Sequence, residues 1–137
     1  MHFLPLAIGN ANALDELSYM RALSRRTELA KAWSLFQAQQ PLILGPVYQT
    51  QPFKVGVDVA GSDEAAKHVN DIRLTLAANV LGLPSVALPT GTAAIDGREF
   101  PQGVQIIGPR YREDLCLDAA ETVEQRLGTL APIDPRP

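Results

Sequence analysis

The sequence is poor in the residues on which several large protein classes depend. Cys116 is the only cysteine among 137 residues, so no intramolecular disulfide can form, which suits a reducing cytoplasm. One cysteine and two histidines, distant in the chain, argue against a zinc site, and we predict no metal and no cofactor. The apolar runs are far shorter than the ~20 residues of a membrane-spanning helix. We therefore predict a cytoplasmic protein without a membrane partner.

Charge of one sign is not concentrated anywhere either. The net charge is −3, and the arginines are interspersed with acids, so no basic surface for nucleic acid is expected. Residues 1–9 are apolar but have no lysine or arginine ahead of them, which argues against a signal peptide. The 46% hydrophobic content is ordinary for a globular protein. We predict one domain over 1–137, with 1–12 and 131–137 loosely attached.

Three segments have the periodicity of helices. The longest is 12–39, with Asn12 as its N-cap and Pro41 as its stop. The second, 62–81, has Ser62 as its N-cap and ends at Gly82, and the third is 114–127. The apolar stripe of the first helix, which includes two aromatic residues expected in the core, consists of Leu14, Leu17, Met20, Leu23, Leu29, Trp33 and Phe36.

Short apolar runs at 42–44, 85–88 and 104–107 predict three strands. The dipeptide Asp96-Gly97 predicts a turn between the last two. Residues 47–61 have no clear period and predict a loop that crosses the surface or lines a cleft. The expected fold class is α/β (mixed α+β): a small mixed sheet of about three strands packed against three main helices.

An ordered set of short motifs carries the functional information. It consists of Asn79-x-x-Gly82-x-Pro84, Pro89-x-Gly91, the run Pro-Gln-Gly-Val-Gln-Ile-Ile-Gly at 101–108, and Arg-Glu-Asp-Leu at 112–115. This set resembles the C-terminal part of the amidase-signature family, which are hydrolases of carboxamide bonds. The resemblance covers about 15–135. It implies a piece that completes the core sheet and the substrate channel of a larger enzyme.

The catalytic residues of that family have no counterpart here. Family members use one lysine and two serines from an upstream Gly/Ser-rich stretch. All five serines of this sequence are isolated, and they are Ser18, Ser24, Ser34, Ser62 and Ser85. The lysines at positions 31, 54 and 67 therefore have no serine cluster to serve. We expect no catalytic residue in this chain and no hydrolysis by the chain alone.

The resemblance does imply positions near a substrate channel. They follow the first strand or precede the motif asparagine, and they are Pro46, Val47, Tyr48, Leu74, Thr75 and Ala78. The residues of the structural motif are Asn79, Gly82, Pro84, Gly103 and Gln105. Asn79 and Gln105 could contact substrate, but the simpler interpretation is structural. Asn79 would anchor the helix end, and a buried Gln105 amide would bond to neighbouring loop backbone. Gly103 would allow close backbone approach.

Two further residues have competing interpretations. His68, near Asp63 and Asp71, could act as a general base, with Ser85 as a nucleophile. A solvated histidine on a polar helix face is the simpler interpretation. Cys116 lies on the apolar stripe of the last helix and is expected in the core.

The expected partners are a missing N-terminal amidase domain or a second copy of the chain, because open strand edges favour self-association. The alternative function is an independent self-associating interaction module without catalytic activity. A third hypothesis is a small-molecule-binding domain that uses the loop 46–61.

Overall fold

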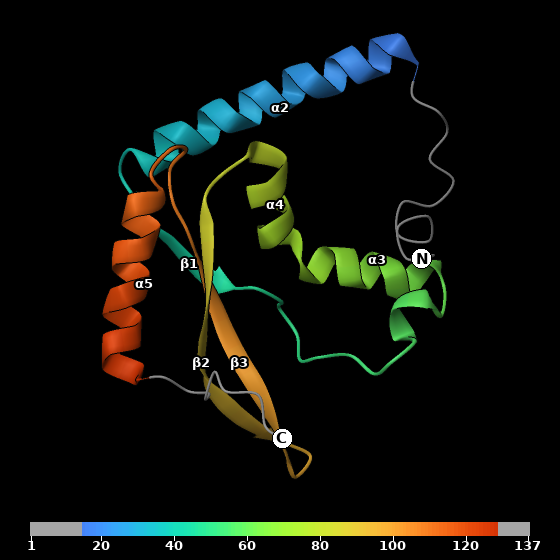
Figure 1. Cartoon of the computed structure of the whole chain (residues 1–137). Coiled ribbons are helices and arrows are strands. Elements are labelled where there is room, and N and C mark those ends of the chain that lie inside the picture. Colours follow the sequence, from blue (N-terminus) through green and yellow to red (C-terminus); the bar gives the residue numbers. More distant parts are fainter. Residues whose placement is uncertain (1–14, 129–137) are drawn as a thin grey trace, which may run out of the picture.

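The computed structural model describes residues 15–128 and arranges helices on both sides of a small sheet (Figure 1). In chain order the elements are α2 (Glu16–Gln37), β1 (Ile43–Pro46), the 3-10 helix η1 (Val57–Val59), α3 (Ser62–Asp71), α4 (Arg73–Leu81), β2 (Ser85–Ile95), β3 (Arg98–Ile107) and α5 (Glu113–Leu127). Among residues 15–128, no helix is both long and apolar enough to cross a membrane. The predicted loose ends, 1–12 and 131–137, lie outside the described residues.

The three predicted strands are present, in the order β1-β3-β2. Both pairs are antiparallel, so the sheet of the described residues is purely antiparallel, whereas the sequence predicts a mixed one. The reason for the β2–β3 pairing is local. Asp96 and Gly97 both have positive φ, 50° and 75°, which is the backbone of the two-residue turn that joins antiparallel strands.

The hairpin strands are longer than predicted. The sequence predicts a strand over 85–88, but β2 continues past Pro89 to Ile95, across an irregularity in register between Pro89 and Gly91. β2 is an edge strand, where a proline removes no ladder hydrogen bond if its nitrogen faces outward. The turn at 96–97 therefore closes a hairpin with strands of 11 and 10 residues, more than twice the length of the apolar runs at 85–88 and 104–107.

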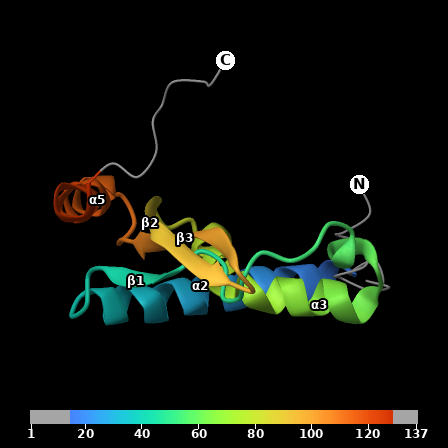
Figure 2. The ribbon, with the colours of Figure 1, turned by 90° about the horizontal axis from the view of Figure 1, so that it is seen from below.

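The two faces of the sheet contact different helices, and successive side chains of each strand point alternately to one face and the other. On one face α5 packs against β2 and β3, and Leu88, Ile106 and Ala120 form the buried core. On the other face Gly45 and Gln105, which are paired in register, lie against α4. Figure 2 shows α5 on one side of the sheet and α2 and α3 on the other.

The helix boundaries correct two predicted caps. α2 begins at Glu16, and Asp15 is its N-cap, because the Ser18 amide donates to Asp15 Oδ1 at 2.7 Å. The predicted cap Asn12 lies outside the described residues. Ser62 is the first residue of α3 instead of its cap.

The second predicted helix is interrupted. Ile72 leaves helical geometry (φ −97°, ψ 13°) and divides the segment into α3 and α4. The predicted end of α4 is confirmed, because Gly82 is its C-cap in the left-handed conformation (φ 66°). One glycine thus ends α4 before the chain enters β2.

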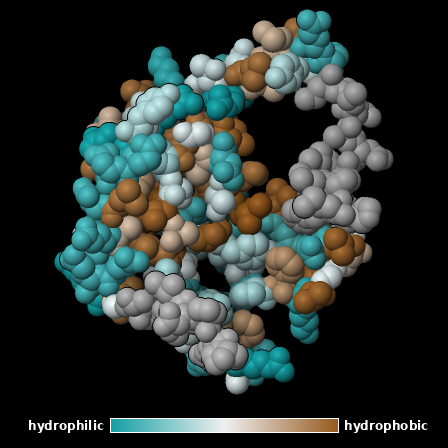
Figure 3. Space-filling model, viewed as in Figure 1, coloured by the Kyte–Doolittle hydropathy of each residue, from teal (hydrophilic) through white to brown (hydrophobic). Residues whose placement is uncertain are grey.

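The apolar stripe of α2 is not in the core. Leu17, Met20 and Phe36 are each more than half exposed, so the core prediction for Phe36 is wrong. Trp33 is half-buried. In the described part of the chain α2 makes its main helix contact with α4, where Arg26 Nε donates to the Val80 carbonyl at 2.5 Å. Figure 3 shows hydrophobic residues gathered around the sheet and α4, with hydrophilic residues on the outer side of α5.

Candidate functional site

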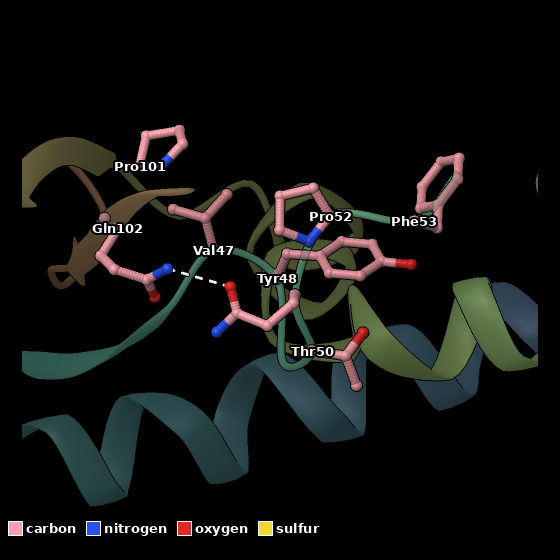
Figure 4. Close-up of a pocket in the computed structure, with 9 residues that line it drawn as sticks. Val47, Tyr48, Thr50, Pro52, Phe53, Pro101 and Gln102 are labelled. Carbon is pink, nitrogen blue, oxygen red and sulfur yellow. Dashed lines mark hydrogen bonds between the residues drawn. The ribbon is translucent and has the colours of Figure 1, made fainter. Parts of the chain in front are cut away.

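A cleft of about 370 Å³ lies where the loop after β1 faces β3. Its lining residues, most of them visible in Figure 4, are Val47, Tyr48, Thr50, Gln51, Pro52, Phe53, Pro101, Gln102 and Gly103. One hydrogen bond connects the two walls, from Gln102 Nε2 to Gln51 Oε1 at 2.9 Å. The cleft therefore depends on two segments about fifty residues apart in the sequence.

Gln105 fixes the loop where it leaves β1. Its side chain is only 3% exposed, and its Nε2 donates to the Pro46 carbonyl at 2.9 Å and to Thr75 Oγ1 at 3.0 Å. The Thr75 hydroxyl donates in turn to the Val47 carbonyl at 3.0 Å. Gln105 Oε1 lies 3.4 Å from Ser85 Oγ. As predicted for a buried glutamine, the amide thus bonds to loop backbone, and two consecutive carbonyls are held in place.

The six predicted channel positions separate into two groups. Val47 and Tyr48 line the cleft, while Pro46 and Thr75 belong to the hydrogen-bonded network at its base. Leu74 instead packs against Gly45, and Ala78 is buried in α4. The structure therefore brings four of the six together at one place.

The motif residues Asn79, Pro84 and Gly103 take part in local backbone contacts. Asn79 is exposed in the last turn of α4, and its main-chain carbonyl accepts from the Gly82 amide at 3.3 Å. This bond does not involve the asparagine side chain, which was expected to anchor the helix end. The Pro84 carbonyl accepts from the Gly108 amide at 3.0 Å, which connects the start of β2 to the end of β3. A Cβ atom at Gly103 would lie 3.0 Å from the Leu88 carbonyl oxygen, so this position does permit the predicted close approach.

His68 is buried, so its interpretation as a solvated residue is wrong. The loop 47–61 folds over α3, and the Tyr48 hydroxyl forms a hydrogen bond with His68 Nδ1. The Phe53 ring lies 4.1 Å from the imidazole, centroid to centroid. Ser85, the candidate nucleophile, forms its hydrogen bond with Gln105 on the sheet.

A second, smaller cavity of about 190 Å³ adjoins these rings. It is lined by Tyr48, Phe53, Asp58, His68 and Ile72. Burial, followed by the charge of Asp71, raises the pKa of the Tyr48 phenol above its ordinary value. Asp71 also accepts from Thr50 Oγ1 at 3.1 Å, so α3 holds the loop at a second point.

The lining of the cleft is uncharged. Among the described residues, no lysine, arginine, aspartate or glutamate lines it, and no group of three or more potential metal ligands occurs. Sequence reasoning missed Gln51, Phe53 and Gln102. The run 47–61 predicted a cleft-lining loop, but nothing in the sequence paired it with residues 101–103.

Comparison with known proteins places the chain in a family. The profile of the family described as Amidase matches residues 4–117. The chain is 41% identical over 123 residues to an indoleacetamide hydrolase from Bradyrhizobium japonicum, covering 88% of this chain and 25% of that protein. It is 32% identical over 115 residues to a glutamyl-tRNA(Gln) amidotransferase subunit from Brucella ovis, covering 83% and 22%.

Solved structures agree on the fold. A 6-aminohexanoate cyclic dimer hydrolase matches with a TM-score of 0.66 and 24% identity, over 89% of this chain and 27% of that one. A crystal structure of an amidase matches with a TM-score of 0.62 and 29% identity, over 84% and 26%. The chain thus spans about a quarter of the length of these relatives. It belongs to the amidase-signature family and corresponds to part of an amidase domain.

Proposed function

We propose that the chain is the C-terminal, non-catalytic portion of an amidase-signature hydrolase of carboxamide C–N bonds. In the parent enzyme it completes the core sheet and forms one wall of the substrate channel. The observation that carries this proposal is the cleft between residues 47–53 and 101–103, where buried Gln105 of the family motif bonds to the start of the loop. Its lining offers surfaces for binding and no reactive pair among the described residues.

The open side of the sheet supports a role within a larger domain. Leu44 and Ile106 are paired in register and share a face, yet Leu44 is 66% exposed while Ile106 is 4% exposed. β1 is an edge strand of the described sheet, and α5 contacts β2 and β3 but not the Leu44 side chain closely enough to bury it. An additional strand or helix against β1 would bury Leu44 and cover the unpaired backbone groups of this edge.

The reaction itself requires residues that this chain does not provide. Its resemblance to the family implies a lysine and two serines for attack on the amide, and all serines of this sequence are isolated. Substrate is therefore an amide that the chain helps to bind, and bond cleavage depends on groups from another segment. The names of the relatives, a hydrolase of indoleacetamide and a component of an amidotransferase, fit this class.

A complementation experiment tests the proposal. The Bradyrhizobium japonicum hydrolase is produced without the segment that matches this chain, and ammonia release from indoleacetamide is measured with and without the chain added. We expect neither polypeptide to be active alone and the mixture to be active, because the chain supplies the missing wall and strands. Leu44→Glu should abolish the rescue, whereas Leu117→Glu, at a 60% exposed leucine on α5, should preserve it.

Two results would contradict the proposal. One is a mixture that stays inactive although both polypeptides are folded. The other is ammonia release by the chain alone that disappears on changing His68 or Ser85, because it would place the reactive groups within this chain.

A second candidate function is an independent, self-associating interaction module. The exposed apolar residues of α2 favour it, since monomers rarely leave such a stripe uncovered. Sedimentation of the purified chain distinguishes the two candidates. The module requires a dimer that persists on dilution and is lost in Met20→Glu, while a chain that is monomeric throughout would eliminate it.

A further inference from the structure

We infer that the cleft binds the uncharged aromatic group of an amide substrate, with Tyr48 and Phe53 as its specificity-determining residues. This inference rests on the proposed function, in which the cleft is a wall of the substrate channel. It goes further by naming a substrate class, and the arguments concern shape, charge and the support of the two rings.

The shape of the cleft suits a flat ring. The Tyr48 and Phe53 rings lie 6.0 Å apart, centroid to centroid, at an angle of 45°. Aromatic rings prefer tilted or offset neighbours at such separations, so a third ring can contact both. Val47 and Pro52 extend the apolar lining from these rings toward Pro101, at the opposite end of the cleft from Phe53 (Figure 4). A volume of about 370 Å³ lies at the lower end of the range for small-molecule pockets.

The charge distribution selects against an ionic ligand group. Among the described residues, none that lines this cleft is charged, so a carboxylate or ammonium group would lose its hydration without compensation. The polar residues are Thr50 and the bonded pair of Gln51 and Gln102. Carboxamides carry more donors and acceptors than one mutual bond uses, so this pair can also bond to an amide ligand.

The aromatic wall is held in place from behind. The Tyr48 hydroxyl is bonded to buried His68, whose ring also packs against Phe53. The loop is fixed on either side by bonds to Asp71 and Gln105. A binding surface whose rings are already ordered loses little conformational entropy when ligand binds.

Ligand titrations of the full 137-residue chain, followed by NMR, test the inference. Three amides are compared: phenylacetamide, cyclohexylacetamide with the same carbon skeleton but a saturated ring, and glutamine with two charged groups. We expect phenylacetamide to bind about two- to tenfold more tightly than cyclohexylacetamide, the range that aromatic pairs contribute beyond buried area. Glutamine should show no binding at the same concentrations.

Two variants locate the binding. Phe53→Ala should remove the preference for phenylacetamide, while Tyr19→Ala, at a half-exposed aromatic residue of α2, should leave it unchanged. Tyr48→Phe keeps the ring and should keep most of the preference, which distinguishes a contact with the ring from damage to the fold.

Every alternative outcome counts against the inference. Equal binding of the saturated ring, tighter binding of glutamine, or no binding of any of the three would overturn it. So would a preference that survives Phe53→Ala. A failed complementation with the aromatic preference intact would refute the proposed function instead, so the two failures can be distinguished.

Discussion

Replacing Gln105 by methionine should destabilise the chain by about 2 kcal/mol. Methionine keeps the length of the side chain but removes both donor bonds of Nε2, to the Pro46 carbonyl and to Thr75 Oγ1. Each such bond contributes roughly 1 kcal/mol net, and the weaker contact with Ser85, at 3.4 Å, adds little. Because Gln105 is 3% exposed, water cannot replace the lost donors.

Urea denaturation followed by circular dichroism measures this loss. With a denaturant slope of about 2 kcal/mol per M, the midpoint should fall by roughly 1 M. Ser85→Ala is the control and should cost less than about 0.5 kcal/mol. Thr75→Val completes a double-mutant cycle, in which the two sites should couple by at least about 0.5 kcal/mol. A loss below about 0.5 kcal/mol in Gln105→Met would refute the idea that this amide holds the loop.

Three further predictions concern separate features. Gly82→Ala should lower the free energy of unfolding by about 1–2 kcal/mol, because φ of 66° strains any residue with a Cβ, and Gly82→Asn should recover part of that loss in urea melts. Hydrogen bonds from Ser18 lower the pKa of the Asp15 carboxyl. The cap therefore contributes its full stability to α2 at a pH above the ordinary aspartate pKa of about 4, and this contribution is lost as the pH falls through the lowered pKa. The Ser18 amide shift should report that titration by NMR and stay constant in Asp15→Asn, and a shift that titrates equally in both variants would contradict the assignment. Burial raises the pKa of the Cys116 thiol, which is 2% exposed, so it should react with a disulfide reagent far more slowly in the native state than in urea; equal rates would refute its place in the core.

Local chemistry explains which parts of the fold could be predicted. Glycine in the left-handed conformation commonly ends a helix, as Gly82 does here. The two-residue turn at 96–97 makes its flanking strands antiparallel without contacts from the rest of the chain. Apolar runs located the three strands but not their full lengths. The outer part of the hairpin contains Thr92, Arg98 and Glu99 at exposed positions, so it lacks the continuous apolar signal of a buried strand.

Contacts between distant segments explain what was missed. His68 has a polar sequence neighbourhood, and only the loop folding over α3 buries it against Tyr48 and Phe53. The interruption at Ile72 was equally invisible, because 62–81 has helical periodicity on both sides of it. Phe36 belongs to an apolar stripe, but such a stripe indicates only that the helix packs against another surface. It does not identify that surface.

By itself, the sequence determined the family, the places of the three strands along the chain, and the absence of a serine pair, since these depend on residue identities and short spacings. Only the tertiary structure decided that residues 47–53 face 101–103 and that Gln105 supports the cleft between them. The physical reason is that a hydrogen bond or ring contact between residues about fifty positions apart leaves no period in the sequence. Such contacts arise when the sheet register brings both segments to one place.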